Sequence, residues 1–254
     1  MPIVYENEIR VSTGDGEMTT FVSHPDDDAA YPVAVLYMDG VGYREQVKEN
    51  ARRFAADGYY VVAPDLFHRS GEKLSFDLSR MGEEGYRERL MEVVSSVTPD
   101  AAMRDTRALL DTVAGDPAAS SGRKVCVGYC MGARLALRFA ATFPDEVVAA
   151  AGIHPGALVT DQPDSPHRDV GSVEGELYFA FAENDQSATP EVVERLRDEL
   201  DAQGVKGVVE RLPGTSHGFA MADLPVYDRP AAERHFERTL EVWRRNLSQQ
   251  PVRA

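Results

Sequence analysis

Residues 124–133, Lys-Val-Cys-Val-Gly-Tyr-Cys-Met-Gly-Ala, decide the fold of this chain. A short apolar β-type run leads into Gly-x-Cys130-x-Gly, and a helical apolar pattern follows over Met131–Phe143. This arrangement is typical of a nucleophile elbow, here with cysteine in place of serine. Side chains two residues before and after the nucleophile would collide in so tight a turn, which explains Gly128 and Gly132. We predict that Cys130 projects above a sheet from a strained backbone; a purely structural Gly-x-Cys-x-Gly turn is the alternative.

Strands and helices alternate on both sides of this turn. An antiparallel hairpin is predicted from Val4–Val11 and Met18–Ser23. Further apolar runs predict strands over Val33–Met38, Tyr59–Ala63, Val125–Val127, Val147–Ile153, Leu177–Ala182 and Val208–Leu212. Helical spacing is found over Arg44–Asp57, Tyr86–Val94, Thr98–Ala114, Pro190–Gln203 and Ala231–Asn246. The alternation predicts an α/β fold, with a mostly parallel central sheet that helices cover on both faces.

We predict one domain over residues 1–254, because no linker or repeat divides the chain. Residues 66–98 are polar and interrupt the alternation. Such an excursion is either a cap over the active site or a plain surface loop. Gly156–Glu174, rich in Pro and Asp, is predicted to be a second long loop.

The net charge of −15 at pH 7 makes binding to nucleic acid or to an anionic membrane surface improbable on electrostatic grounds. The two cysteines are too few for a secreted disulfide framework, and Cys126 is expected to be a buried core residue. No apolar stretch approaches the ~20 residues of a spanning helix, and the first residues lack a signal-peptide pattern. We therefore expect a soluble cytoplasmic protein, monomeric or homodimeric.

A nucleophile on such a turn needs an acid and a base later in the chain. Carboxylates follow one predicted strand in Glu183-Asn184-Asp185, and His217 follows the last predicted strand. Asp185 is favoured as the acid because it is nearer the apex of its loop, with Glu183 as the rival. His154 also follows a strand, where it either lines the substrate pocket or simply ends the strand. No spacing of His, Cys, Asp and Glu predicts a metal site.

Four segments together resemble the dienelactone hydrolase family of α/β-hydrolases. They are Gly-Tyr-Cys130-Met-Gly, the Asn-Asp185-Gln loop, Ser-His217-Gly-Phe and Pro64-Asp-Leu-Phe67, and the resemblance covers roughly residues 30–247. It implies an α/β-hydrolase fold and hydrolysis of a small ester or lactone through a covalent acyl-enzyme. It implies no metal and no organic cofactor. Within it, Cys130 matches the nucleophile, His217 the base and Asp185 the acid.

The resemblance also shows where this chain departs from the family. Asp39 stands where the family has a glutamate that helps to ionise the thiol. The aspartate side chain is one methylene shorter than glutamate, and the other interpretation is that Asp39 simply caps its loop. Met221 stands where dienelactone-cleaving members carry an arginine that holds the substrate carboxylate. A second such arginine belongs to the 66–98 region, where the candidates are Arg69, Arg80, Arg87 and Arg89.

The expected reaction is attack of the Cys130 sulfur on an ester carbonyl while His217 moves the protons. Backbone amides of Met131 and of Gly40 are expected to hold the oxyanion. The same machinery would serve a thioester or a short acyl-peptide, so a thioesterase or another acyl hydrolase is an alternative. A non-catalytic relative that binds a small ligand or a partner is a third hypothesis.

Overall fold

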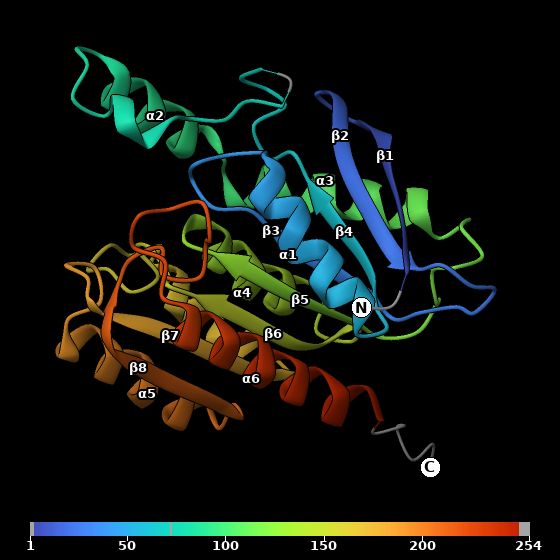
Figure 1. The fold of residues 1–254 in the computed structure, drawn as a ribbon. Coiled ribbons are helices and arrows are strands. Elements are labelled where there is room, and N and C mark those ends of the chain that lie inside the picture. The colour runs from blue at the N-terminus through green and yellow to red at the C-terminus, as the bar shows by residue number, and fades with distance from the viewer. Residues whose placement is uncertain (1–2, 72, 249–254) are drawn as a thin grey trace. The chain divides into compact units, whose positions relative to one another are not determined.

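The computed structural model describes residues 3–71 and 73–248, and its chain forms two compact units, Met1–Gly122 and Arg123–Ala254 (Figure 1). Each unit combines strands with helices. Across the described ranges, none of the helices has the length and apolar character needed to cross a bilayer.

The first unit is built on four strands in the order β1-β2-β4-β3. These are β1 (Val4–Thr13), β2 (Gly16–Pro25), β3 (Val33–Tyr37) and β4 (Tyr60–Pro64). β2 pairs antiparallel with β1 and β4, whereas β3 and β4 are parallel. Every residue of β3 and β4 is buried, as expected for parallel strands covered on both faces.

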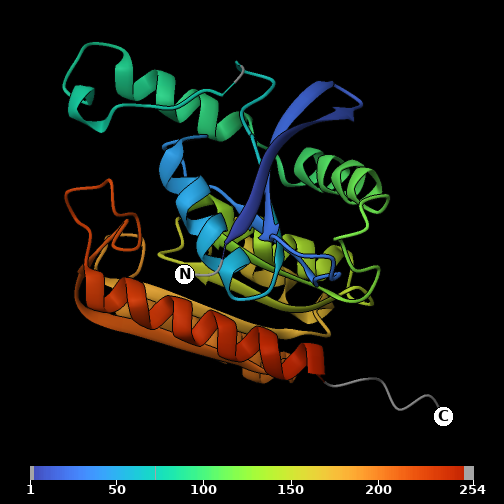
Figure 2. The same cartoon turned by 45° about the vertical axis from the view of Figure 1, so that its right-hand side comes forward.

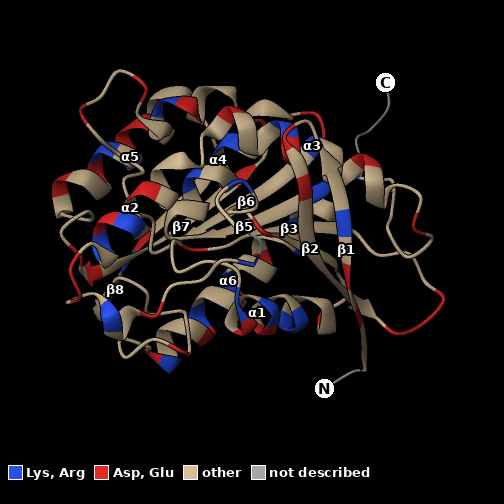
Figure 3. Cartoon of the chain, turned by 90° about the horizontal axis from the view of Figure 1, so that it is seen from above, with Lys and Arg blue, Asp and Glu red and all other residues tan. Residues whose placement is uncertain are grey.

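Helices α1 (Glu45–Ala56) and α3 (Pro99–Val113) lie on opposite faces of these strands (Figure 3). α3 begins with proline, and the Thr98 hydroxyl caps it by accepting a hydrogen bond from the Ala101 amide. On α1, acidic and basic side chains are interleaved, and Arg52 donates to Glu45 and Glu49. Both helices confirm the sequence prediction.

The 66–98 segment contains a short 3-10 helix, η1 (Leu78–Arg80), and α2 (Tyr86–Ser96). α2 runs two residues beyond the predicted end at Val94. Three of the four arginines considered for a substrate carboxylate are ion-paired here: Arg69 with Asp105, Arg80 with Glu83 and Arg89 with Glu92. The cap role of the segment stays a prediction.

The second unit is a fully parallel four-stranded array in the order β5-β6-β7-β8. Its strands are β5 (Lys124–Tyr129), β6 (Val147–Ile153), β7 (Glu176–Asn184) and β8 (Gly207–Ser216). Helices α4 (Met131–Thr142) and α5 (Pro190–Gln203) cover one face, and α6 (Arg229–Ser248) covers the other (Figure 3). β7 and β8 are longer than predicted, so that Asp185 and His217 each follow a strand directly.

A buried carboxylate connects the start of β7 to the end of α6, the long helix that runs beside the strands in Figure 2. The Glu176 side chain is 2% exposed and accepts hydrogen bonds from Arg245 Nε at 2.8 Å and Asn246 Nδ2 at 2.8 Å. The Lys206 ammonium lies 3.0 Å away. Burial raises the pKa of Glu176, but these hydrogen bonds outweigh it and lower the pKa to about 2. The carboxylate is therefore charged and fully partnered.

The structure corrects the prediction of a plain loop over Gly156–Glu174, because a 3-10 helix, η2 (Pro166–Ser172), lies within it. The buried Ser165 hydroxyl accepts from the Thr160 amide at 2.7 Å and bonds His167 Nδ1 at 2.7 Å. This pair fixes the approach to η2. A 3-10 helix has no 3.6-residue periodicity, so an apolar pattern does not reveal it.

Candidate active site

Cys130 lies at the turn between β5, which ends at Tyr129, and α4, which begins at Met131. Its backbone has φ 53° and ψ −113°, a conformation that non-glycine residues rarely adopt and that costs of order 1–3 kcal/mol. Its amide donates to Ile153 O at 3.0 Å, and its carbonyl accepts from Ala133 and Gly156 at 3.1 and 3.2 Å. These bonds hold the strained turn in place.

Gly128 is required by close approach in this turn. A Cβ atom at residue 128 would lie 2.0 Å from Gly132 O and 2.7 Å from Ala133 N. Both neighbours are backbone atoms, so a rotamer change cannot relieve the contact. The geometry agrees with the collision that the sequence motif predicts.

We expect Gly128→Ala to lower the free energy of unfolding by about 3 kcal/mol, because the added methyl forces the strand and the helix apart. Thermal and urea unfolding of the purified variant would measure the loss. Gly115→Ala is the matched control, since a Cβ at residue 115 meets nothing within 4 Å. Equal stability of the two variants would contradict the argument.

His217 connects the sulfur to a carboxylate. Its Nε2 lies 3.0 Å from Cys130 Sγ, and its Nδ1 lies 2.6 Å from Asp185 Oδ2. Asp185 and His217 follow the carboxyl ends of β7 and β8, the edge at which open parallel sheets carry their sites. The structure thus brings the three predicted side chains into one hydrogen-bonded row.

The electrostatics of this row favour a protonated imidazole. Burial lowers the pKa of His217, but the hydrogen bonds to Asp185 and Cys130 outweigh burial and raise it to about 10. For Asp185, burial raises the pKa, and the hydrogen bond with His217 reverses this and holds it below its ordinary value. An imidazolium between a sulfur and a carboxylate is thus stabilised from both sides.

The two rival carboxylates have different partners. Glu183 Oε2 accepts from the Gly214 amide at 2.8 Å, a contact to the end of β8. Asp185 bonds His217 through Oδ2. Its other oxygen, Oδ1, accepts from the Ser187 amide at 2.9 Å and the Ser187 hydroxyl at 2.7 Å. Ser187 therefore orients the Asp185 carboxylate. Our sequence reasoning missed it, although Asp-x-Ser spacing is a recognisable side-chain turn signal.

Arg134 was also missed. It lies on α4, four residues after Cys130. Its Nε is buried and has no hydrogen-bond partner among the described residues. Burial lowers the pKa of Arg134.

His154 packs against the imidazole of His217. The two rings meet edge to face with centroids 5.2 Å apart, and Phe219 meets His154 in the same way at 5.3 Å. His154 is 1% exposed, and neither of its ring nitrogens has a hydrogen-bond partner within the described part of the chain. Burial lowers its pKa well below the ordinary value, so the ring is neutral.

The remaining predicted residues divide between the units. Met131 is the first residue of α4, where the backbone amide has no acceptor within the helix. Asp39 and Gly40 follow β3 in the first unit. The Asp39 carboxylate accepts from Arg44 at 2.6 and 3.1 Å and from the Val41 amide at 3.1 Å. These are contacts of a loop-capping carboxylate, and the thiol-activating role of Asp39 stays a prediction.

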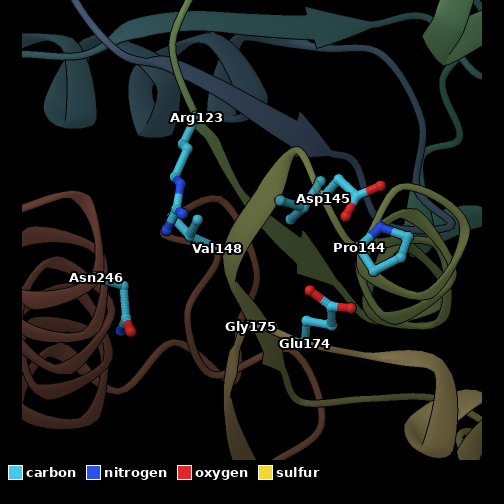
Figure 4. A pocket seen from close by; sticks show the side chains of 8 residues that line it. Arg123, Pro144, Asp145, Val148, Glu174, Gly175 and Asn246 are labelled. Carbon is cyan, nitrogen blue, oxygen red and sulfur yellow. The ribbon is translucent and has the colours of Figure 1, made fainter. Parts of the chain in front are cut away.

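A pocket in the second unit lies at the other ends of the strands (Figure 4). It is lined by Arg123, Pro144, Asp145, Val147, Val148, Glu174, Gly175 and Asn246. Arg123, Val147 and Gly175 mark the amino ends of β5, β6 and β7, whereas the reactive row follows the carboxyl ends. The pocket is therefore separate from the row. Within the described ranges, no cluster of three or more His, Cys, Asp or Glu side chains is arranged to hold a metal ion.

Comparison with known proteins identifies the family of this chain. The model of the dienelactone hydrolase family matches residues 18–247. A Salmonella typhi protein that carries the provisional name carboxymethylenebutenolidase is 28% identical over 239 residues, covering 91% of this chain and 83% of its own. Carboxymethylenebutenolidase 1 of Cupriavidus pinatubonensis is 23% identical, with 91% and 93% covered.

The same architecture occurs in solved structures. The crystal structure of a provisionally named dienelactone hydrolase from Klebsiella pneumoniae superposes with a TM-score of 0.84 at 20% identity, covering 95% of this chain and 99% of that one. At this identity the likeness establishes the fold alone. The chain therefore has the predicted α/β fold with mostly parallel strands.

Proposed function

We propose, since the chain belongs to the dienelactone hydrolase family, that it hydrolyses a small ester or lactone through a Cys130–His217–Asp185 triad. Family membership makes the protein a carboxylic ester hydrolase. The observation that carries the finer proposal is the continuous hydrogen-bonded row, with His217 3.0 Å from the sulfur and 2.6 Å from the carboxylate. Nucleophile, base and orienting acid are recognised by this geometry.

In the acylation step, the Cys130 sulfur attacks the carbonyl carbon as a thiolate and forms a C–S bond. The thiol proton resides on His217 Nε2, where Asp185 stabilises the imidazolium. The carbonyl oxygen becomes an oxyanion, which the Met131 amide and the positive end of α4 stabilise. When the C–O bond of the ester breaks, the departing alcohol oxygen takes the proton from Nε2.

In the deacylation step, water attacks the thioester carbon and gives its proton to Nε2. The C–S bond then breaks, the sulfur leaves as a thiolate, and the acid is released. We assign a second oxyanion donor to Gly40 and a place in the substrate pocket to His154. Met221, a fully buried apolar side chain, stands where the family's carboxylate-binding arginine is expected.

Thiol labelling and hydrolysis test the proposal together. We expect iodoacetamide to label one of the two cysteines in the native enzyme, because Cys130 is partly exposed whereas Cys126 is fully buried. Burial also raises the pKa of Cys126 and so suppresses its reactive thiolate. Activity towards p-nitrophenyl acetate, a dienelactone and an acyl-thioester should fall in parallel with labelling.

The outcomes separate the hypotheses. Full activity after complete labelling would contradict the cysteine mechanism. Labelling without turnover of any of the three compounds would favour the ligand-binding hypothesis. Because Met221 replaces the arginine, we expect the neutral ester to be cleaved at a rate comparable to that of the dienelactone.

A further inference from the structure

The turn from His154 to Ala157 contains a glycine, Gly156, at a position where the backbone conformation does not call for one. His154 has φ 39° and Ala157 has φ 51°, both in the left-handed region that favours glycine. Gly156, between them, does not adopt a positive φ. Its lack of a side chain is therefore not explained by backbone conformation.

Packing in the resting enzyme does not explain this glycine either. A Cβ at residue 156 would lie 3.5 Å from Cys130 Sγ and 3.7 Å from His217 Cε1. Both are ordinary van der Waals distances, so alanine fits when the sulfur carries nothing. The Gly156 amide donates to Cys130 O at 3.2 Å, and the His154 amide donates to Ala180 O at 2.7 Å, so the turn is held against the triad.

The missing side chain matters once the sulfur carries an acyl group. The departing alcohol must accept a proton from Nε2 while it is still bonded to the carbonyl carbon. Water must later occupy the same place to reach that carbon and Nε2. A methyl group in contact with both the sulfur and the imidazole would border this space.

We propose that Gly156 borders the position shared by the leaving alcohol and the attacking water, and so sets the size of alcohol that the enzyme releases. This inference rests on the proposed triad. The strain at His154 and Ala157 is consistent with it, because strained residues persist where the surrounding structure holds a functional turn in place.

Gly156→Ala tests the proposal with two series of esters. One series varies the alcohol from methanol to a branched alcohol with acetate as the constant acyl group; the other varies the acyl group with a constant alcohol. We expect kcat/KM to fall about 10- to 100-fold more for the bulkiest alcohol than for methanol, the usual effect of one methyl in a tight site. Across the acyl series the loss should be uniform.

Pre-steady-state kinetics give a second readout. Because p-nitrophenol is much larger than water, Gly156→Ala should slow acylation by p-nitrophenyl acetate more than deacylation, so that p-nitrophenol appears without a burst and acetyl-enzyme does not accumulate in mass spectra. Gly115→Ala is the control with neither effect, since residue 115 lies in open space without a positive φ.

Three results would overturn the inference. One is a loss that follows acyl size, another is unchanged selectivity, and the third is a Gly156→Ala protein that does not fold, because a resting clash would then explain the glycine. Failure of the triad proposal is distinguishable from all of these, since Cys130→Ala would then retain activity in the wild-type background.

Discussion

Replacement of Cys130 with alanine is expected to lower kcat/KM for ester hydrolysis by about 10⁴- to 10⁶-fold, the range seen when the nucleophile of a triad is removed. The thioester cannot form without the sulfur, and His217 has no group to deprotonate. The fold should survive, because Cys130 is only partly buried and alanine removes a single atom, the sulfur, from it. No contact that the fold requires is lost. Ester hydrolysis and thermal unfolding of the purified variant check both statements.

Cys126→Ala provides the matched control. Cys126 is fully buried in β5, and its Sγ donates to Ala136 O at 3.5 Å. We expect this variant to keep its activity while losing some stability, since it deletes a buried atom. Comparable activity of the two cysteine variants would rule out Cys130 as the nucleophile.

Asp185→Asn is expected to lower kcat by about 10³- to 10⁴-fold. The amide retains the size of the carboxylate, but it no longer stabilises the imidazolium, and its NH₂ group facing Nδ1 favours the wrong tautomer of His217. The pKa of His217 should fall because a hydrogen bond that raises it is lost. A pH–rate profile and NMR titration of His217 would show the two changes together.

Glu183→Gln is the matched control for Asp185→Asn. It removes a carboxylate from the same loop, but its partner is the Gly214 amide rather than the imidazole. We expect activity within about threefold of wild type, as for an ordinary surface substitution. A larger loss in Glu183→Gln than in Asp185→Asn would identify Glu183 as the acid.

The elbow and the order of its partners could be predicted because their requirements are local. Gly128 and Cys130 are constrained by a turn of five residues, and Asp185 and His217 each come within a few residues of the end of an apolar run. The helices of the second unit could likewise be predicted from helical spacing, as over Pro190–Gln203 for α5.

What could not be predicted depends on contacts between distant residues. The insertion of β4 between β2 and β3 is a matter of strand pairing, which residue patterns do not encode. β8 continues through Pro213 and Gly214, which resemble a turn in the sequence but lie within the strand here. The choice between Asp185 and Glu183 required the hydrogen bonds themselves.

The buried Glu176 carboxylate determines how short the last helix can be. α6 has 20 residues and is therefore about 30 Å long, and its final turn carries Arg245 and Asn246, which donate hydrogen bonds to Glu176. A chain that stopped one turn earlier would keep nearly all of the helix's apolar contacts, including Trp243, yet leave a charged group inside without these donors. Removing a partner from a buried carboxylate costs up to about 3–5 kcal/mol, and only Lys206 would remain beside Glu176, so the stability of this unit depends on polar contacts at the helix end as well as on its apolar core.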